Sequence, residues 1–325
     1  MVRSENSIPH HWCDGRVQRG VLVMLKQLSI VICTYNRAPL LERTLLALRE
    51  LKRIEEAEVI VVDNNSSDDT AVVVRSCIER CRGQLDIQYV LERKQGLSAA
   101  RNTGIKAACS GIIAFLDDDA IPVHGWIHAI LEAFEQDPRT AAVGGIVYPN
   151  FETERPSWLI KPLELPYTIV NLGSEVRPYP KKLYPVGANM AFRSTVFERF
   201  SFPEELGRKG ESLTSGEESW LFDRLKKQRM LITYLPSMTV HHFISRERLT
   251  KEWIAKRYYY QGLSYAFASR TTAAKLKLVL LTCMKAVYVF GELLLSRSEG
   301  SRLLVQCRRE SIRGTFSNLK FINRS

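Results

Sequence analysis

The chain has few cysteines, and their spacing matches neither a disulfide framework nor a zinc site. The seven that are present are odd in number, are scattered, and include no pair separated by two residues. This usage indicates a reducing compartment. Residues 1–15 also lack an uninterrupted apolar stretch after their basic residue, so we expect no secretory signal.

The chain also lacks a long apolar run free of charge. The best candidate, residues 276–295, is long enough to cross a bilayer but contains Lys277, Lys285 and Glu292. We expect an amphipathic helix at a membrane interface, with its lysines reaching the headgroups. The alternative is a helical cap that packs on the rest of the protein or dimerises, because a buried core helix has the same apolar content.

Excess charge is absent from the first three quarters of the chain. The whole net charge of +11 lies after Ser245, where 16 Lys or Arg accompany 5 Asp or Glu. A basic C-terminal region of this kind favours an anionic membrane surface as partner. We expect no nucleic-acid partner, and we predict peripheral attachment at the cytoplasmic face of a membrane.

Short apolar runs alternate with helical periodicity in the first third of the chain. A 325-residue chain with 45% hydrophobic residues is long enough for one large α/β domain and an appendage. Buried strands are predicted at residues 27–36, 57–63 and 85–91, and helices at 37–51 and 70–81. This order indicates a parallel sheet with right-handed crossovers. Residues 1–27 show no clear period and are treated as an N-terminal extension.

Three consecutive carboxylates follow the most apolar of these runs. Residues 112–120 read IIAFLDDDA, with Gly111 before them and Pro122 just after, which predicts a buried strand that ends in Asp117, Asp118 and Asp119. Ligands bind at the carboxyl ends of parallel strands, and carboxylate oxygens suit Mg²⁺ or Mn²⁺. The sequence therefore predicts a metal-bound phosphate here. A solvated acidic turn is the alternative.

Two further segments have features of a binding site. Residues 92–105 lead into a helix that begins near Leu97 or Ser98, where Arg101 can reach a phosphate through its planar fork of donors; an ordinary capped helix with a solvated arginine is the alternative. Residues 148–185 contain seven prolines, so we expect an irregular segment of the kind that often forms lids or binding loops.

Several motifs occur together in a recognisable order. They are SIVICTYNR, VVDNNSSDDT, ERKQGLSAARNTGI, FLDDDAIPVHGW, GANMAFR and GEESWLFDRLKKQRMLITYLPSMTVHH. The set resembles the family-two inverting glycosyltransferases and covers roughly residues 28–242. The resemblance implies an α/β fold of the GT-A type, with a mostly parallel central sheet flanked by helices. We therefore expect a GT-A domain at 28–245 and a basic, partly amphipathic helical appendage at 246–325.

The first motifs imply a nucleotide-sugar site. By the resemblance, Thr34 and Tyr35 line the nucleotide pocket, Asp63 contacts the base, and Arg101 lies beside the sugar-nucleotide. UDP is the nucleotide that we expect.

The acidic triplet resembles the DxD motif of the family. Asp119 is then the expected direct metal ligand, and Asp117 lies near the ribose or the metal. Asp118 occupies the variable middle position of the motif. It is expected among the residues that contact the nucleotide-sugar. A divalent ion here neutralises the departing diphosphate, which is otherwise a poor leaving group.

The remaining motifs imply sugar contacts, a base and a third metal ligand. Asn189 in GANMAFR is expected to donate hydrogen bonds to sugar hydroxyls, although the segment is also compatible with a plain strand edge. In GEES, Glu218 stands where the family has a catalytic Asp, and Glu217 is expected next to the sugars. Glutamates also suit a helix N-terminus. His242, six residues after Pro236, matches a metal-binding His of the family and favours Mn²⁺ over Mg²⁺. His241 is the alternative if the register differs by one.

These observations favour inverting transfer of a sugar from a nucleoside-diphosphate donor to an acceptor hydroxyl of unknown identity. A nucleotidyltransferase on a related scaffold is less favoured, because CTYNRAPLL is not a Gly-rich, basic phosphate loop. A non-catalytic sugar-binding relative is a further alternative, which the glutamate at position 218 raises.

Overall fold

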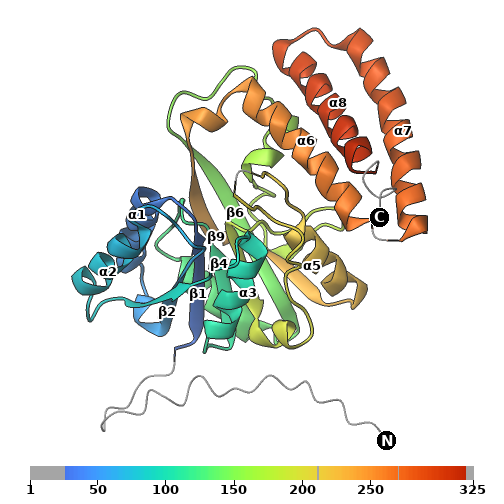
Figure 1. Ribbon diagram of the computed structural model, residues 1–325. Coiled ribbons are helices and arrows are strands. Elements are labelled where there is room, and N and C mark those ends of the chain that lie inside the picture. Colours follow the sequence, from blue (N-terminus) through green and yellow to red (C-terminus); the bar gives the residue numbers. More distant parts are fainter. Residues whose placement is uncertain (1–25, 211, 270, 320–325) are drawn as a thin grey trace, which may run out of the picture.

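A single mixed sheet forms the centre of the molecule (Figure 1). The computed structural model describes residues 26–210, 212–269 and 271–319, so nearly all of the extension predicted at 1–27 lies outside the described residues. Along the sheet the strand order is β3-β2-β1-β4-β8-β6-β9-β5, and β7 pairs with β9 at the side.

The first half of the sheet is parallel, as predicted. Alternating strands and helices run in the order β1 (Leu28–Thr34), α1 (Ala38–Arg49), β2 (Ala57–Asp63), α2 (Thr70–Arg80), β3 (Asp86–Leu91), α3 (Leu97–Ala107) and β4 (Ile112–Leu116). All seven residues of β2 are buried, because a strand covered by helices on both faces has no polar side. The carboxyl ends of β1 and β4 therefore lie at the same edge.

The second half of the sheet adds antiparallel strands to the predicted α/β fold. Here β8 runs antiparallel to both β4 and β6, while β9 pairs parallel with β6 and antiparallel with β5. The elements of this half are β5 (Ala120–Pro122), α4 (Trp126–Gln136), β6 (Thr140–Phe151), β7 (Arg177–Pro178), β8 (Asn189–Arg193), α5 (Glu217–Lys227) and β9 (Leu231–Ile244). Since β5 pairs with β9, His242 is opposite Ala120 and next to the acidic triplet.

Helices cover both faces of the sheet. One apolar cluster contains residues of α1, α2 and α4, including Leu45, Val74 and Trp126. The other joins α3 and α5 to the opposite face and contains edge-to-face phenylalanines around Phe115. Such aromatic pairs add about 0.5–1.5 kcal/mol each beyond the area that they bury.

The proline-rich segment is mostly irregular, as expected, although its first residues continue β6. After Phe151 it forms only two short 3₁₀ helices, Lys161–Leu163 and Leu165–Tyr167, and the two-residue strand β7. Trp158, Leu163 and Tyr167 of this segment are buried.

The C-terminal region consists of α6 (Lys251–Ala268), α7 (Thr272–Leu295) and α8 (Glu299–Leu319). Two of these helices, α6 and α8, share an apolar cluster with the proline-rich segment, in which Ile254 and Leu303 contact the side chains around Leu163. The two helices cross closely at Gly262, where an added Cβ would lie 2.0 Å from the Ser311 carbonyl oxygen. Helices α6 and α8 therefore form a helical cap that packs on the proline-rich segment, whereas the cap considered in the sequence analysis concerned residues 276–295.

Helix α7 lies on the outside of this cap (Figure 1). Lys285 donates to Ser311 Oγ at 3.1 Å and Glu292 pairs with Arg308, so both charges face α8. The outer surface is apolar, and it exposes Val287 and Leu294 by 76% each. Among the described residues, α7 is the one helix long and apolar enough to cross a membrane.

Gly262→Ala should destabilise the protein, because the methyl group has no room against α8. Gly291→Ala on α7 is the matched control, since no atom lies within 4 Å of its added Cβ, and it should stabilise by roughly 0.5–1 kcal/mol. Urea unfolding of both variants measures the difference. Equal stabilisation in the two would contradict the close crossing of α6 and α8.

Candidate active site

A cavity of about 1040 Å³ opens at the carboxyl ends of β1 and β4. Its walls also include the proline-rich segment, the first turn of α5, and residues of α6 such as Tyr265. Ligand sites in open α/β sheets occupy this edge, and the volume suits a ligand of nucleotide-sugar size.

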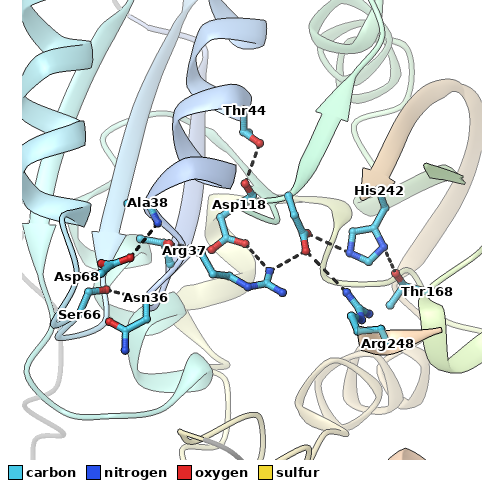
Figure 2. A network of polar contacts seen from close by, with 12 residues as sticks. Asn36, Arg37, Ala38, Thr44, Ser66, Asp68, Asp118, Thr168, His242 and Arg248 are labelled. Atoms are coloured by element: carbon cyan, nitrogen blue, oxygen red, sulfur yellow. Dashed lines mark hydrogen bonds and ion pairs between the residues drawn. The ribbon is translucent and has the colours of Figure 1, made fainter. Parts of the chain in front are cut away.

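Two of the three carboxylates after β4 are buried and held by neighbouring side chains (Figure 2). Thr34 Oγ1 donates to Asp118 Oδ2 at 2.7 Å, and Thr44 Oγ1 donates to the Asp118 carbonyl at 2.8 Å. Arg37 Nη1 bridges Asp118 Oδ1 at 2.9 Å and Asp119 Oδ2 at 2.7 Å. These contacts fix the turn that presents the acidic triplet.

Burial disfavours the charged form of both carboxyl groups, but their pKa values shift in opposite directions because their neighbours differ. It raises the pKa of Asp118 to about 6, with Arg37 opposing and the charge of Asp119 adding to the rise. For Asp119, burial again disfavours the charged form, but His242, Arg37 and Arg248 more than offset it and hold the pKa below its ordinary value. Asp119 therefore stays charged at a lower pH than Asp118 does.

Asp117, Asp119 and His242 have potential ligand atoms within 4.8 Å of one another. His242 Nε2 is 3.0 Å from Asp119 Oδ1, and Nδ1 is 3.1 Å from Thr168 Oγ1. Because that hydroxyl donates to the Tyr167 carbonyl at 2.6 Å, it accepts from Nδ1. In the neutral imidazole that a metal requires, the hydrogen is then on Nδ1 and the lone pair of Nε2 faces the carboxylates.

This arrangement fits a divalent cation. Two carboxylates and an oriented imidazole suit Mn²⁺, and the carboxylates also suit Mg²⁺. Asp119 Oδ1 is buried and makes no hydrogen bond within the described residues, which is the state expected of an oxygen that binds a metal.

A second pair of carboxylates begins α5 on the other side of the cavity. Arg101 Nη1 donates to Glu217 Oε1 and to Glu218 Oε1, both at 3.1 Å. The side chain of Glu217 is 3% exposed and that of Glu218 is 21% exposed. Of the two, Glu218 is therefore the one that an acceptor can reach.

The two glutamates also differ in protonation. Burial and the charge of Glu218 raise the pKa of Glu217 to about 7. Burial acts on Glu218 too, but Arg101 together with hydrogen bonds from the backbone and from Glu217 holds its pKa below the ordinary value. Near neutral pH Glu218 thus carries the negative charge that a base needs.

Gly187 lies directly against the side chains of Arg101 and Glu218. A Cβ at this position would lie 2.0 Å from Arg101 Nη2 and 2.6 Å from Glu218 Oε1. A side chain at position 187 would displace Arg101 and Glu218. The glycine of the GAN segment therefore leaves the space that these two side chains occupy.

The other predicted nucleotide contacts are found in different surroundings. Tyr35 lines the cavity and is 39% exposed. Asp63 is buried and accepts from Ser66 N at 2.8 Å and from Tyr89 Oη at 2.7 Å, while the next residue, Asn64, lines the cavity. The predicted contact of Asp63 with the base stays a prediction.

The expected role of Asn189 is wrong in this structure. The side chain is fully buried in β8, donates to the carbonyls of Ile146 and Met238, and accepts from Trp126 Nε1 at 2.8 Å. Both amide hydrogens are used, so none remains for a sugar hydroxyl. Asn189 joins strands of the sheet instead.

Several arginines of the site were missed in the sequence, among them Arg37, Arg208, Arg248 and Arg257. Arg37, the last residue of SIVICTYNR, bridges two aspartates, and its position directly after the first strand was the available signal. Arg248 and Arg257 come from the basic C-terminal region and line the same cavity. Their positions showed no motif, because a distant segment brings them to the sheet edge.

Solved structures resemble the fold over most of its length. The mannosyltransferase PcManGT from Pyrobaculum calidifontis, in complex with GDP-Man and Mn²⁺, superposes with a TM-score of 0.61 at 18% identity, covering 91% of this chain and 88% of that one. The structure of GalNAc-T7 with UDP, GalNAc and Mn²⁺ superposes with a TM-score of 0.53 at 18% identity, covering 74% of this chain and 50% of that one. The fold is of the GT-A class.

The sequence comparison gives the family. The family described as Glycosyl transferase family 2 matches residues 29–200, more than half of the chain. The chain therefore belongs to glycosyl transferase family 2 and is a glycosyltransferase, which confirms the resemblance found in its motifs.

Curated relatives carry glycosyltransferase names. The glucosyl-dolichyl phosphate glucuronosyltransferase of Haloferax volcanii is 26% identical over 248 residues, 73% of this chain and 76% of the relative. The pre-mycofactocin glycosyltransferase of Mycobacterium tuberculosis is 29% identical over 251 residues, 75% of this chain. The match covers 48%, about half, of that mycobacterial protein.

Asp119→Asn should weaken Mn²⁺ binding at least tenfold, because it removes a charged ligand and leaves the side-chain volume unchanged. Calorimetry of Mn²⁺ binding in the presence of UDP measures the change. Asp223→Asn, a carboxylate of the same cavity outside the metal cluster, is the control and should bind as wild type does. Equal weakening in both variants would rule out the Asp119 site.

Proposed function

We propose that this enzyme transfers a sugar from a nucleoside-diphosphate donor to an acceptor hydroxyl with inversion at the anomeric carbon. The observation that carries the proposal is the position of Glu218, which is charged, partly exposed, and in the same cavity as the Asp117, Asp119 and His242 cluster. Residues 28–245 would form the catalytic domain, with the helices of 246–325 completing the cavity wall.

The donor would bind at the carboxyl ends of β1 and β4. Thr34, Asp118 and Arg37 would keep the acidic turn in place, while Asp117, Asp119 and His242 would hold a divalent ion. That ion, when bound, supplies positive charge against the diphosphate. Arg248 Nη1, 3.8 Å from Asp119 Oδ2, is placed to add a second positive charge. A UDP-sugar stays our predicted donor, and Mn²⁺ is favoured over Mg²⁺.

The acceptor would bind on the side of α5. Glu218 removes the hydroxyl proton as the oxygen attacks the anomeric carbon from the face opposite the phosphate. The new carbon–oxygen bond forms while the bond to phosphate breaks, and its electron pair leaves with the diphosphate. Arg101 keeps the Glu218 carboxylate charged and oriented.

Glu218→Gln should lower kcat by a factor of about 10² to 10⁴, the usual contribution of a general base, with nucleotide and metal binding retained. Glu217→Gln should cost much less at pH 6, where the raised pKa of about 7 keeps Glu217 protonated and neutral. Steady-state nucleotide release by the two variants makes the comparison. A greater loss in Glu217→Gln would assign the base to position 217.

We also propose that the outer face of α7 rests on an anionic membrane surface, at the cytoplasmic side as the sequence led us to expect. The exposed apolar residues of α7 support this, because two of the charges that interrupt the helix, Lys285 and Glu292, face α8. Exposed arginines at 297, 302 and 309 lie close by in the chain. The name of the Haloferax relative, which includes a dolichyl phosphate, agrees with a lipid-linked acceptor.

Val287→Glu combined with Leu294→Glu should lower partitioning onto anionic vesicles by about tenfold or more, since burying each side chain contributes about 1.5–3 kcal/mol. Added salt should also weaken binding. Co-sedimentation measures both effects. Val72→Glu, an exposed apolar site on α2, is the control and should bind as wild type does; equal partitioning of all variants would exclude the α7 surface.

A further inference from the structure

Two arginines of the cavity have guanidinium groups that the protein leaves largely unpaired. Arg248 Nε and Nη2, and Arg257 Nε and Nη1, are buried and have no hydrogen-bond partner within the described residues. Buried donors of this kind are costly unless a ligand satisfies them. Arg257 Nη2 donates a hydrogen bond to Ser215 Oγ at 3.1 Å.

The nearby carboxylates do not satisfy these groups. Asp118 and Asp119 are bridged by Arg37, and Glu217 and Glu218 are bound by Arg101. Burial and the nearby charge of Arg208 lower the pKa of both Arg248 and Arg257 to about 10. The cavity thus contains positive charge beyond what its own carboxylates balance.

The two arginines serve different ends of the cavity. Arg248 is 3.8 Å from Asp119, at the metal cluster where the donor diphosphate is proposed. Arg257 comes from α6, bonds Ser215 just before α5, and is close enough to Glu217 and Glu218 to feel their charges. It therefore belongs to the acceptor side.

We infer that Arg257, together with Arg208 of the same cavity wall, binds a phosphoryl group of the acceptor beside Glu218. This rests on the proposed function and adds the chemical class of its acceptor. Two guanidinium groups match the charge of a phosphate monoester, and the planar donors of arginine match its oxygens.

The cavity wall indicates where such a phosphate can come from. It continues past Tyr265 and Ala268 of α6 to Thr271 and Ala274 at the start of α7, the helix whose outer face is apolar. A lipid phosphate and a soluble sugar phosphate share the phosphoryl group, and they differ in whether an alkyl chain adds affinity.

Calorimetry with the donor site saturated by UDP and Mg²⁺ tests the site on the full-length protein. The probes are inorganic phosphate, ethyl phosphate and a prenyl phosphate in neutral detergent. Wild type should bind all three, and Arg257→Gln should weaken each by about 10- to 100-fold through loss of charge-assisted hydrogen bonds. Arg257→Lys should weaken phosphate binding less than Arg257→Gln does, because lysine keeps the positive charge. Tighter binding of the prenyl phosphate would identify a lipid source, and equal affinities a soluble one.

Lys256→Gln, which removes an exposed charge from the adjacent position, is the matched control and should bind the probes as wild type does. UDP binding should be unchanged in Arg257→Gln. Three outcomes would overturn the inference. Phosphate binding to wild type could disappear once UDP saturates the protein, or it could be equal in wild type and Arg257→Gln. In the third, Arg257→Gln would lose UDP binding together with phosphate binding. Failure of wild type to bind UDP would instead count against the proposed function.

Discussion

The site depends on the compensation of buried negative charge. Four carboxylates at one end of the sheet are largely removed from water, and each would be costly there without a cation. Arg37 spans Asp118 and Asp119, and Arg101 spans Glu217 and Glu218. Each guanidinium thus holds two carboxylates at a fixed separation. Burial disfavours the charged form of all four groups, and their different neighbours leave the pKa raised for Asp118 and Glu217 and lowered for Asp119 and Glu218.

The cap formed by α6 and α8 extends this charge pattern. It packs on the proline-rich segment through an apolar cluster and brings Arg248 and Arg257 to the cavity from outside the matched family region. The family motifs therefore account for the carboxylates and for Arg37 and Arg101, while Arg248 and Arg257 come from the C-terminal region.

Sequence patterns predicted the parallel half of the fold closely. The strands at 57–63 and the helices after 97 and 70 follow directly from apolar period and turn residues, because local signals determine buried strands and amphipathic helices. The mixed half of the sheet depends on antiparallel pairings of β8 with β4 and β6, which no local period encodes. Asn189 shows the same limit within the site: its residue type suited a sugar contact, but only the fold shows that three neighbours already use its amide.

The bonds that assemble the site join distant parts of the chain. Thr34 and Asp118 are 84 residues apart, and Arg101 and Glu217 are 116 apart. During synthesis from the N-terminus, the parallel strands and the two aspartates of the candidate metal cluster emerge well before His242. An incomplete chain can therefore present acidic groups but not the complete ligand set. Metal affinity would rise only when β9 enters the sheet, so the cation would favour the finished protein over its folding intermediates and bind last.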